Sequence, residues 1–300
     1  DAARHRGCNR NANECFGCCG PDGNHWAFSM DDMKWYMDWL FVRGVNLLFP
    51  HAFYYSIDGE IRYGERPPDV GIHNIWWKYY EKVSTYIKRL SWLMSGSHNT
   101  TPFAVLCEED NLPWKMVEDL YQDQIEFNYL EKELLLSDKC KILKGSIGIQ
   151  NQNYRYLLVE DKKLLTQDLK DKLKPFIENG GSIILSSDLN VSLLERDAVI
   201  TPANKDLRIS HVIKNGLHFY LLVNEGENTI KGEIGVPIQG LVEIWNPWTG
   251  TITSEKNILK EFSLNRRESL ILCIDPCKKN KEELSNKKIE INKWKIGSKD

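Results

Sequence analysis

The stretch Arg43-Gly44-Val45-Asn46-Leu47-Leu48-Phe49-Pro50-His51 decides how the first part of the chain folds. Its centre, Val45 to Phe49, is a nearly unbroken apolar run, which is typical of a parallel strand buried on both faces. The glycine before the run ends a helix, and the proline and histidine after it open a long polar and aromatic loop. We therefore expect helix, strand and loop in this order.

The sequence on either side repeats this pattern. Upstream, Asn11 to Phe16 is expected to be a short strand, and a helix with Ser29 as its N-cap follows a loop rich in glycine and cysteine. Downstream, the loop from Ala52 to Asn74 leads into a helix from Trp76 to Met94. The order strand, loop, helix, strand, loop, helix predicts two βα units of a barrel or of a doubly wound sheet over residues 1–97.

Two further units and a tail follow. Residues 101–188 alternate apolar strands with amphipathic helices, which predicts a small α/β domain, and we expect 113–136 to be mostly helical. Residues 206–276 contain short strands separated by turn signals such as Asn215-Gly216, which predicts an antiparallel β-sandwich. The polar residues 277–300 indicate a linker toward a further domain, whose first strand would contain Trp294.

Composition excludes several classes of function. The 300 residues are 42% hydrophobic with a net charge of -3, so nothing draws the chain to nucleic acid or to an anionic membrane. No apolar run reaches the roughly 20 residues of a membrane helix. The chain begins at Asp1 without Met or signal peptide, so we interpret it as the C-terminal part of a longer protein whose cellular address is unknown.

The eight cysteines give no clear ligand pattern. Cys8, Cys15, Cys18 and Cys19 crowd into the N-terminal region, but no second ligand pair matches the Cys-x-x-Cys spacing, so we predict no metal site and assign these four no role. Free thiols in this number favour a reducing compartment.

Glu14 is the residue best placed for chemistry. Catalytic groups of α/β barrels follow the C-terminal ends of strands, and glycoside cleavage needs two carboxyl groups there. On residue type alone, however, a glutamate at a strand end is more often an exposed or paired carboxylate.

The loop after the second strand has the composition of a sugar site. Aromatic rings stack on pyranose faces, and polar groups bond the hydroxyls. The candidate substrate contacts are Asn13, His51, Tyr54, Tyr55, Arg66, Asp69 and Trp76. The alternatives remain open: His51 can be a structural histidine, and Trp77 and Tyr80 can be core residues of the helix.

These residues carry a resemblance. Asn13-Glu14-Cys15-Phe16-Gly17, Arg43-Gly44-Val45-Asn46 and Pro50-His51-Ala52-Phe53-Tyr54-Tyr55-Ser56 resemble the end of the catalytic barrel in the alpha-L-rhamnosidase family of bacterial glycoside hydrolases. The order of the three units is similar to that of three-domain beta-galactosidases, in which a (β/α)8 barrel precedes a small α/β domain and a β-sandwich. The resemblance is strongest over Asn11 to Trp92, and the sandwich segment Glu243 to Gly250 also fits.

The resemblance implies roles for the loop residues. Glu14 would end strand seven and His51 would follow strand eight, with the general acid upstream of Asp1. Glu14 would be the nucleophile of a retaining enzyme, or a base that activates water in an inverting one. It implies a glycan as substrate and no cofactor beyond a calcium ion, for which the sequence offers no ligand set.

Two other hypotheses stay open. The chain can be a non-catalytic carbohydrate-binding or oligomerisation module, and uncovered strand edges would favour homo-oligomers. The α/β domain also resembles the amidotransferase-like and flavodoxin-like sheets, with Cys107 at the end of its first strand, but no Cys-His-Glu triad can be assembled around it.

Overall fold

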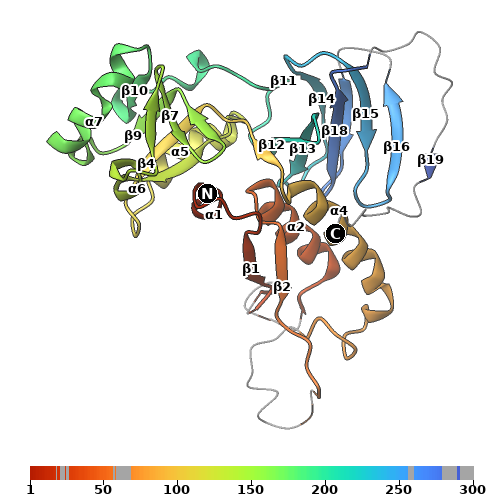
Figure 1. Cartoon of the computed structure of the whole chain (residues 1–300). Helices are drawn as coiled ribbons and strands as arrows, with labels where there is room; N and C mark the ends of the chain where they lie inside the picture. The colour runs from red at the N-terminus through yellow and green to blue at the C-terminus, as the bar shows by residue number, and fades with distance from the viewer. Residues whose placement is uncertain are drawn as a thin grey trace.

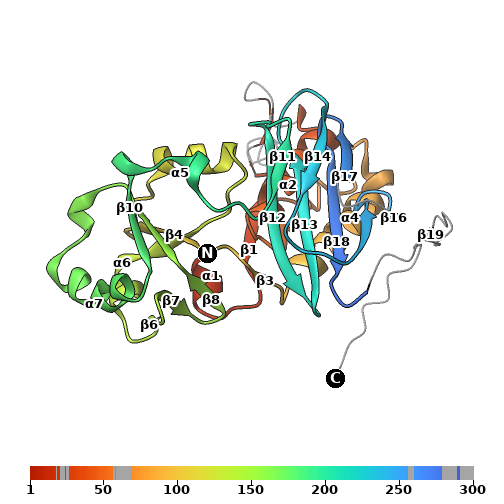
Figure 2. The ribbon, with the colours of Figure 1, turned by 90° about the horizontal axis from the view of Figure 1, so that it is seen from above.

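The computed structural model describes residues 1–17, 19–20, 24, 27–56, 58, 69–255, 260–278 and 289–290. In Figures 1 and 2 the α/β unit and the antiparallel sheets lie side by side, and the N-terminal unit packs beneath them in Figure 1. The predictions for Arg66, Cys18 and Trp294 fall outside the described residues.

The N-terminal unit is built around one parallel pair of strands. After a short helix, α1 (Ala2–His5), come β1 (Ala12–Cys15), α2 (Met30–Val42), β2 (Leu47–Pro50), the 3-10 turn η3 (Trp77–Tyr79) and α4 (Tyr80–Met94). β1 and β2 pair in parallel, with Glu14 beside Phe49. The predicted order of elements is confirmed, although the first turn of the second helix is the separate 3-10 turn.

Local signals explain where these elements begin and end. Ser29 accepts a hydrogen bond from the Asp32 amide, and the Asp32 side chain accepts one from the Ser29 amide, which forms a capping box. Gly44 adopts φ +90° after α2, a conformation that favours glycine. Asn46 is buried because its amide group bridges Asn11 to the carbonyl of Met94 at the end of α4.

The two helices cover only one face of the parallel pair. Cys15 and Leu48 are buried with Met37, Phe41 and Leu90 of the helices. The same cluster continues into the antiparallel sheet, so α2 and α4 lie between the parallel pair and that sheet, as Figure 1 also shows. The opposite face of β1 and β2 has no helix of the described part of the chain against it.

The second unit contains a four-stranded parallel sheet in the order β10-β9-β4-β5. Its elements are β4 (Phe103–Cys107), α5 (Trp114–Gln122), β5 (Asn128–Glu131), α6 (Lys132–Leu136), β9 (Tyr156–Val159), η4 (Lys162–Leu164), α7 (Gln167–Glu178) and β10 (Ser182–Leu185). The 3-10 turns η5 (Ser186–Asp188) and η6 (Val191–Leu193) follow.

Two features of this unit were not predicted. Residues 113–136 contain the helices α5 and α6, but β5 lies between them and pairs in parallel with β4. Asn128 is buried in that strand and donates to the Tyr154 hydroxyl, a tertiary contact that local helical pattern does not reveal. The antiparallel sheet of β6 (Lys141–Leu143), β7 (Ser146–Ile149) and β8 (Gln152–Tyr154) was also missed.

The third unit is antiparallel throughout. A seven-stranded sheet runs in the order β19-β16-β15-β18-β13-β12-β3, and a three-stranded sheet in the order β11-β14-β17. The bounds are β3 (His98–Asn99), β11 (Val199–Thr201), β12 (Leu207–Lys214), β13 (Leu217–Asn224), β14 (Ile230–Gly235), β15 (Leu241–Trp245), β16 (Thr251–Glu255), β17 (Lys260–Leu264), β18 (Ser269–Asp275) and β19 (Ile289–Glu290).

The packing of these sheets is consistent with the expected β-sandwich. Residues of both sheets, among them Ile234, Phe262 and Leu272, form one buried cluster. Asn215 and Gly216 both have positive φ and join β12 to β13 in the predicted tight hairpin.

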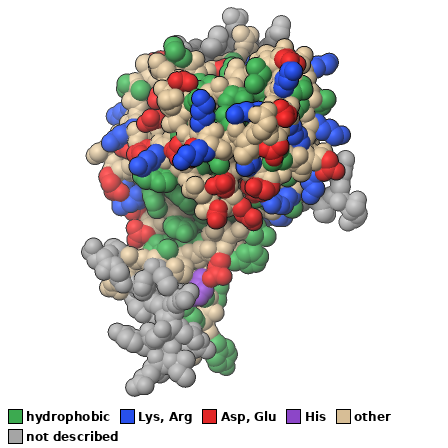
Figure 3. Space-filling view, turned by 90° about the vertical axis from the view of Figure 1, so that its left-hand side faces the viewer, with side chains coloured by type: hydrophobic (Ala, Val, Ile, Leu, Met, Phe, Trp, Pro, Cys, Tyr) green, Lys and Arg blue, Asp and Glu red, His purple; other side chains and the backbone are tan. Residues whose placement is uncertain are grey.

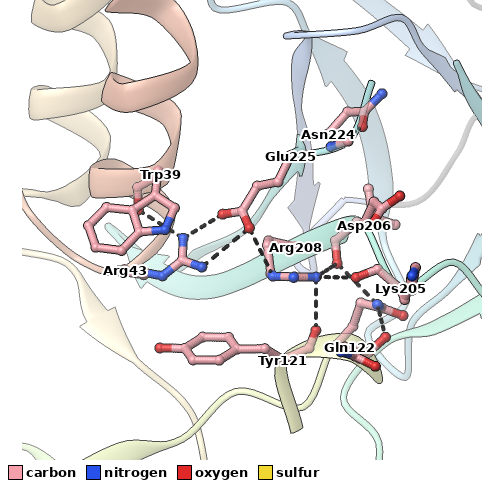
Figure 4. Close-up of polar contacts among 12 residues, drawn as sticks. Trp39, Arg43, Tyr121, Gln122, Lys205, Asp206, Arg208, Asn224 and Glu225 are labelled. Carbon is pink, nitrogen blue, oxygen red and sulfur yellow. Dashed lines mark hydrogen bonds and ion pairs between the residues drawn. The ribbon is translucent and has the colours of Figure 1, made fainter. Parts of the chain in front are cut away.

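An ion-pair network fixes the three units to one another (Figure 4). Arg43, at the end of α2, donates to Oε1 of Glu225 at 2.5 Å, and Arg208 Nε of β12 lies 3.1 Å from Oε2 of the same residue. Arg208 also donates to the Tyr121 carbonyl of α5, 3.2 Å away. The side chains of Arg43, Arg208 and Glu225 are largely buried. The single carboxylate of Glu225 thus bridges two guanidinium groups that come from different units.

Candidate functional site

Glu14 points away from the helices. Successive side chains of a strand face opposite sides, so the burial of Cys15 and Leu48 against the helices places Glu14 and Phe49 on the other face. The Glu14 side chain is exposed, and Phe49 is 56% exposed. The carboxylate therefore stands on the uncovered face at the C-terminal end of a parallel strand.

Asn13 lies on the opposite face from Glu14. Its side chain is half-buried, and its Oδ1 is buried with no hydrogen-bond partner in the described part of the chain. The structure therefore does not bring Asn13 together with the glutamate, although they are neighbours in sequence.

His51 lies at the junction of the two strand ends. Its backbone amide donates to the Cys15 carbonyl at 2.7 Å, which extends the pairing of β1 and β2 by one bond. A Cβ on Gly17 would lie 3.4 Å from the His51 ring, an ordinary van der Waals distance, so the loop after β1 runs directly beside this ring. His51 Nδ1 is buried and has no hydrogen-bond partner within the described ranges. The Tyr54 ring meets the His51 ring edge-on at 6.2 Å.

Asp69 is fully buried at the returning end of the same loop. Its Oδ1 accepts a hydrogen bond from the Gly71 amide at 2.6 Å, and its carbonyl accepts one from Asn74 Nδ2 at 2.9 Å. Its Oδ2 is buried without a hydrogen-bond partner among residues that the structure describes. The Val70 amide donates to the Ala52 carbonyl at 2.9 Å, which places Asp69 next to the start of the loop.

An aromatic ledge follows the loop. We use this name for Phe53, Trp76, Trp77 and Tyr80. Trp76 and Trp77 stack on Tyr80 at 6.3 and 5.0 Å, and Phe53 meets Tyr80 edge-on at 5.6 Å. Phe53 is 52% exposed, whereas Trp76 and Tyr80 pack against the buried cluster below. The ledge is thus part core and part surface.

Tyr55 has a different position from Tyr54. It is 95% exposed, so it does not pack into the ledge. On the face shown in Figure 3, charged side chains of both signs cover the upper part, while apolar side chains and a histidine gather lower, toward the β1–β2 unit.

The described residues show no cluster of metal-ligating side chains. No group of three His, Cys, Asp or Glu side chains in the described ranges is placed to hold a metal ion. No helix in the same part of the chain is long and apolar enough to cross a membrane.

The Cys107 thiol at the end of β4 is not activated as a nucleophile. Burial, and after it the nearby Glu131, raise the pKa of this thiol to about 12, so it lacks the thiolate character of a nucleophile.

Comparison with solved structures shows a glycoside hydrolase-like fold. A rhamnosidase from Novosphingobium sp. PP1Y matches with a TM-score of 0.71 and 16% identity, over 95% of this chain and 33% of that one. Gan42B, a GH42 beta-galactosidase from G. stearothermophilus, matches with a TM-score of 0.57 and 11% identity, over 87% of this chain and 53% of the other. A beta-galactosidase from Bacillus circulans sp. alkalophilus matches with a TM-score of 0.53 and 9% identity, over 81% of this chain and 52% of the other.

The extent of these matches limits what they establish. This chain spans about a third of the rhamnosidase and about half of the two beta-galactosidases. No model of a protein family matches the chain, and no curated protein matches it by sequence. The predicted resemblance to glycoside hydrolases is confirmed at the level of the fold.

Proposed function

We propose that this chain forms part of a glycoside hydrolase that releases a terminal sugar from an oligo- or polysaccharide. Glu14 acts as its nucleophile or as the general base. The observation that carries the proposal is the place of Glu14, exposed at the C-terminal end of a parallel strand on the face that α2 and α4 leave uncovered. The general acid would come from a barrel strand that these 300 residues do not contain.

The arrangement of the units supports a barrel origin for β1 and β2. In a (β/α)8 barrel the helices cover the outside and the other face of each strand looks into the barrel. That α2 and α4 pack on one face of this pair and leave the other uncovered supports such an origin. The sheet order β10-β9-β4-β5 agrees with the first four strands of a flavodoxin-like sheet. A barrel end, an α/β domain and a β-sandwich would then follow one another as in three-domain beta-galactosidases.

The loop after β2 would form one side of the sugar site. We propose His51, Tyr54 and Tyr55 as substrate contacts, because His51 and Tyr54 touch and Tyr55 is free to reach outward. We also keep four other residues as proposed substrate contacts: Trp76, Asp69, Arg66 and Asn13. Asp69 and Asn13 each hold a buried oxygen without a hydrogen-bond partner in the described ranges, so a contact with substrate would require their exposure.

The test is an assay of the protein encoded by the reading frame that contains this chain, including any residues before Asp1. Aryl rhamnosides and aryl galactosides are the probes. Glu14→Gln should lower kcat by roughly 10² to 10⁴-fold, because an amide neither attacks carbon nor takes a proton. Glu178→Gln, which changes an exposed glutamate of α7, is the matched control. Equal kcat values for Glu14→Gln and the control would refute the role of Glu14.

One further readout separates the possible roles. Proton NMR of the first product released by the unmodified protein gives retention if Glu14 is a nucleophile and inversion if it is a base.

A second candidate function rests on the exposed apolar side chains near the ledge. Tyr55, Ile72 and Ile75 are 95, 64 and 93% exposed. Such a concentration is typical of a binding surface, so a non-catalytic carbohydrate-binding or oligomerisation module is the alternative. Glycan binding or self-association with no hydrolysis of any probe would favour it.

A further inference from the structure

A cavity of about 390 Å³ lies between the start of α2 and two turns of the antiparallel sheets. Met30, Asp31 and Lys34 line it from the helix. The turn between β15 and β16 adds Asn246, Trp248 and Thr249. The turn between β17 and β18 adds Arg266, Arg267 and Glu268, and Ser269 is the first residue of β18. Its volume falls in the range of roughly 300 to 1,000 Å³ that small-molecule sites occupy.

Lys34 gives this cavity a buried charged group. Its side chain is 9% exposed, and its Nζ lies 2.6 Å from Oδ2 of Asp38 and 3.1 Å from the Ser269 hydroxyl. The Tyr86 hydroxyl bonds to both Asp38 and Ser269, so it holds the two acceptors in place. An ammonium has three donors, of which Asp38 and Ser269 take two. Nζ also lies 4.4 Å from the centre of the Tyr86 ring, so the ammonium is held firmly beside the cavity that Lys34 lines.

Trp248 gives the cavity an aromatic wall. The half-buried indole packs on the Tyr86 ring at 5.3 Å and lies 5.9 Å from Lys34 Nζ. The Asn246 side chain accepts hydrogen bonds from the amides of Trp248 and Thr249, which fixes the turn that carries the indole. The contact with Tyr86 and the hydrogen bonds of the turn therefore fix the position of the Trp248 indole before any ligand binds.

Each cation around the cavity has a carboxylate beside it. Arg266 Nε lies 2.5 Å from Oε2 of Glu227, and Arg266 also pairs with Asp31. Arg267 Nη2 lies 2.8 Å from Oε1 of Glu227, and Lys34 has Asp38 as its partner. Because Glu268 also lines the cavity, the carboxylates outnumber the cations, so an anionic ligand gains no net electrostatic advantage here.

We propose that this cavity is a glycan-binding site that takes one neutral pyranose unit, with a face of the sugar ring stacked on Trp248. An aromatic wall beside a small set of fixed donors and acceptors is the composition that recognises a sugar. Lys34 donates to a hydroxyl group, and the carboxylates of Asp31 and Glu268 accept from others. Structural anchoring alone does not call for such a network, because well-packed apolar residues anchor a helix at least as stably as a buried ion pair.

The site is separate from the proposed active site. Its lining contains no residue of β1, of β2 or of the loop after β2. It therefore goes beyond the proposed function and does not depend on the role of Glu14. A protein with this site would hold a glycan at a second point while another unit is processed.

Saturation-transfer NMR and calorimetry on the 300-residue chain test the proposal. The probes are methyl β-D-galactopyranoside, methyl α-L-rhamnopyranoside and methyl β-D-glucopyranoside, with methyl β-D-glucuronide as the charged comparison. We expect binding of at least one neutral probe, and a loss of affinity of about tenfold or more in Trp248→Ala. Thr249→Trp changes an exposed rim residue and should fill the cavity with the same result, even if Trp248→Ala does not fold.

Two controls assign the binding to this cavity. Trp114→Ala removes an exposed tryptophan of α5, and Glu14→Gln alters the proposed active site. Both should leave the affinity unchanged. Absence of binding to all three neutral probes would overturn the proposal, as would binding that survives Thr249→Trp or disappears in Glu14→Gln. Tighter binding of the glucuronide than of any neutral probe would also overturn it.

Discussion

Glu14 and Phe49 are partners in the register of the parallel pair β1–β2, and both side chains stand on the face opposite α2 and α4. Their neighbours Cys15 and Leu48 are 1% and 9% exposed, against 56% for Phe49. One face of the pair is thus an ordinary hydrophobic core, while the other presents a carboxylate beside an exposed aromatic ring. This asymmetry supports the proposal that Glu14 has a chemical role rather than a structural one.

The first prediction compares the two faces directly. Leu48→Ala should lower the free energy of unfolding by about 2 to 5 kcal/mol, because it opens a cavity under the helices. Phe49→Ser should lower it by less than about 1 kcal/mol, since little packing is lost on the exposed face. Urea unfolding of both variants measures the difference. Equal costs would show that something in the chain covers the Phe49 face.

Local sequence was enough to predict the elements whose ends are set by their own residues. The Ser29 cap precedes α2 in the sequence, and the Asn215-Gly216 turn sits between two apolar strands. Both use hydrogen bonds or backbone angles within a few residues, so tertiary contacts do not alter them.

Features that depend on distant residues were not predictable. β5 forms because β4 offers a parallel edge, although the surrounding residues are compatible with a helix. In the candidate site, the sequence placed Glu14 and His51 at strand ends, but the burial of Asp69 follows from the path of the loop back to Ala52. Asn13 follows strand alternation: it lies on the face opposite Glu14, although the two residues are adjacent in sequence.

The second prediction concerns the junction of the units. Glu225→Ala should cost about 3 to 5 kcal/mol, because it leaves the guanidinium groups of Arg43 and Arg208 buried without their common anion. Glu195→Ala is the matched control, since its pair with Arg155 is more than half exposed and should be worth at most about 1 kcal/mol. Thermal or urea unfolding gives both values. Similar costs for the two variants would mean that the junction network contributes no more than a surface pair.

The third prediction tests the thiol at the end of β4. Burial and nearby carboxylates raise the pKa of Cys107, so it should resist iodoacetamide in the native chain. The exposed Cys8 and Cys277 should be alkylated quickly, and Cys107 only after unfolding in urea. Mass spectrometry of peptides locates each modification. Alkylation of Cys107 at the rate of Cys277 would reopen the hypothesis of a nucleophilic cysteine.

The fourth prediction is a dependence of stability on pH through His5. Burial is the main cause that lowers the pKa of His5 from 6.5 to about 3, and the nearby Arg4 and Arg6 act in the same direction. Between these values the unfolded chain binds a proton that the folded chain does not, so stability should rise with pH across this window. Each pH unit within the window is worth up to about 1.4 kcal/mol. The contribution is complete above pH 6.5 and is lost as the pH falls toward 3.

His98 and His218 also have pKa values lowered by burial, so the test must isolate His5. Urea unfolding at several pH values between about 4 and 7 should give a smaller slope for His5→Gln than for the unmodified chain. Tyr154→Phe removes the hydroxyl that lies 2.6 Å from His5 Nε2 but keeps the ring that buries it. That variant should be less stable at every pH and should retain the slope, because burial rather than the hydrogen bond is the main cause. A slope that falls in Tyr154→Phe and stays in His5→Gln would reverse this assignment.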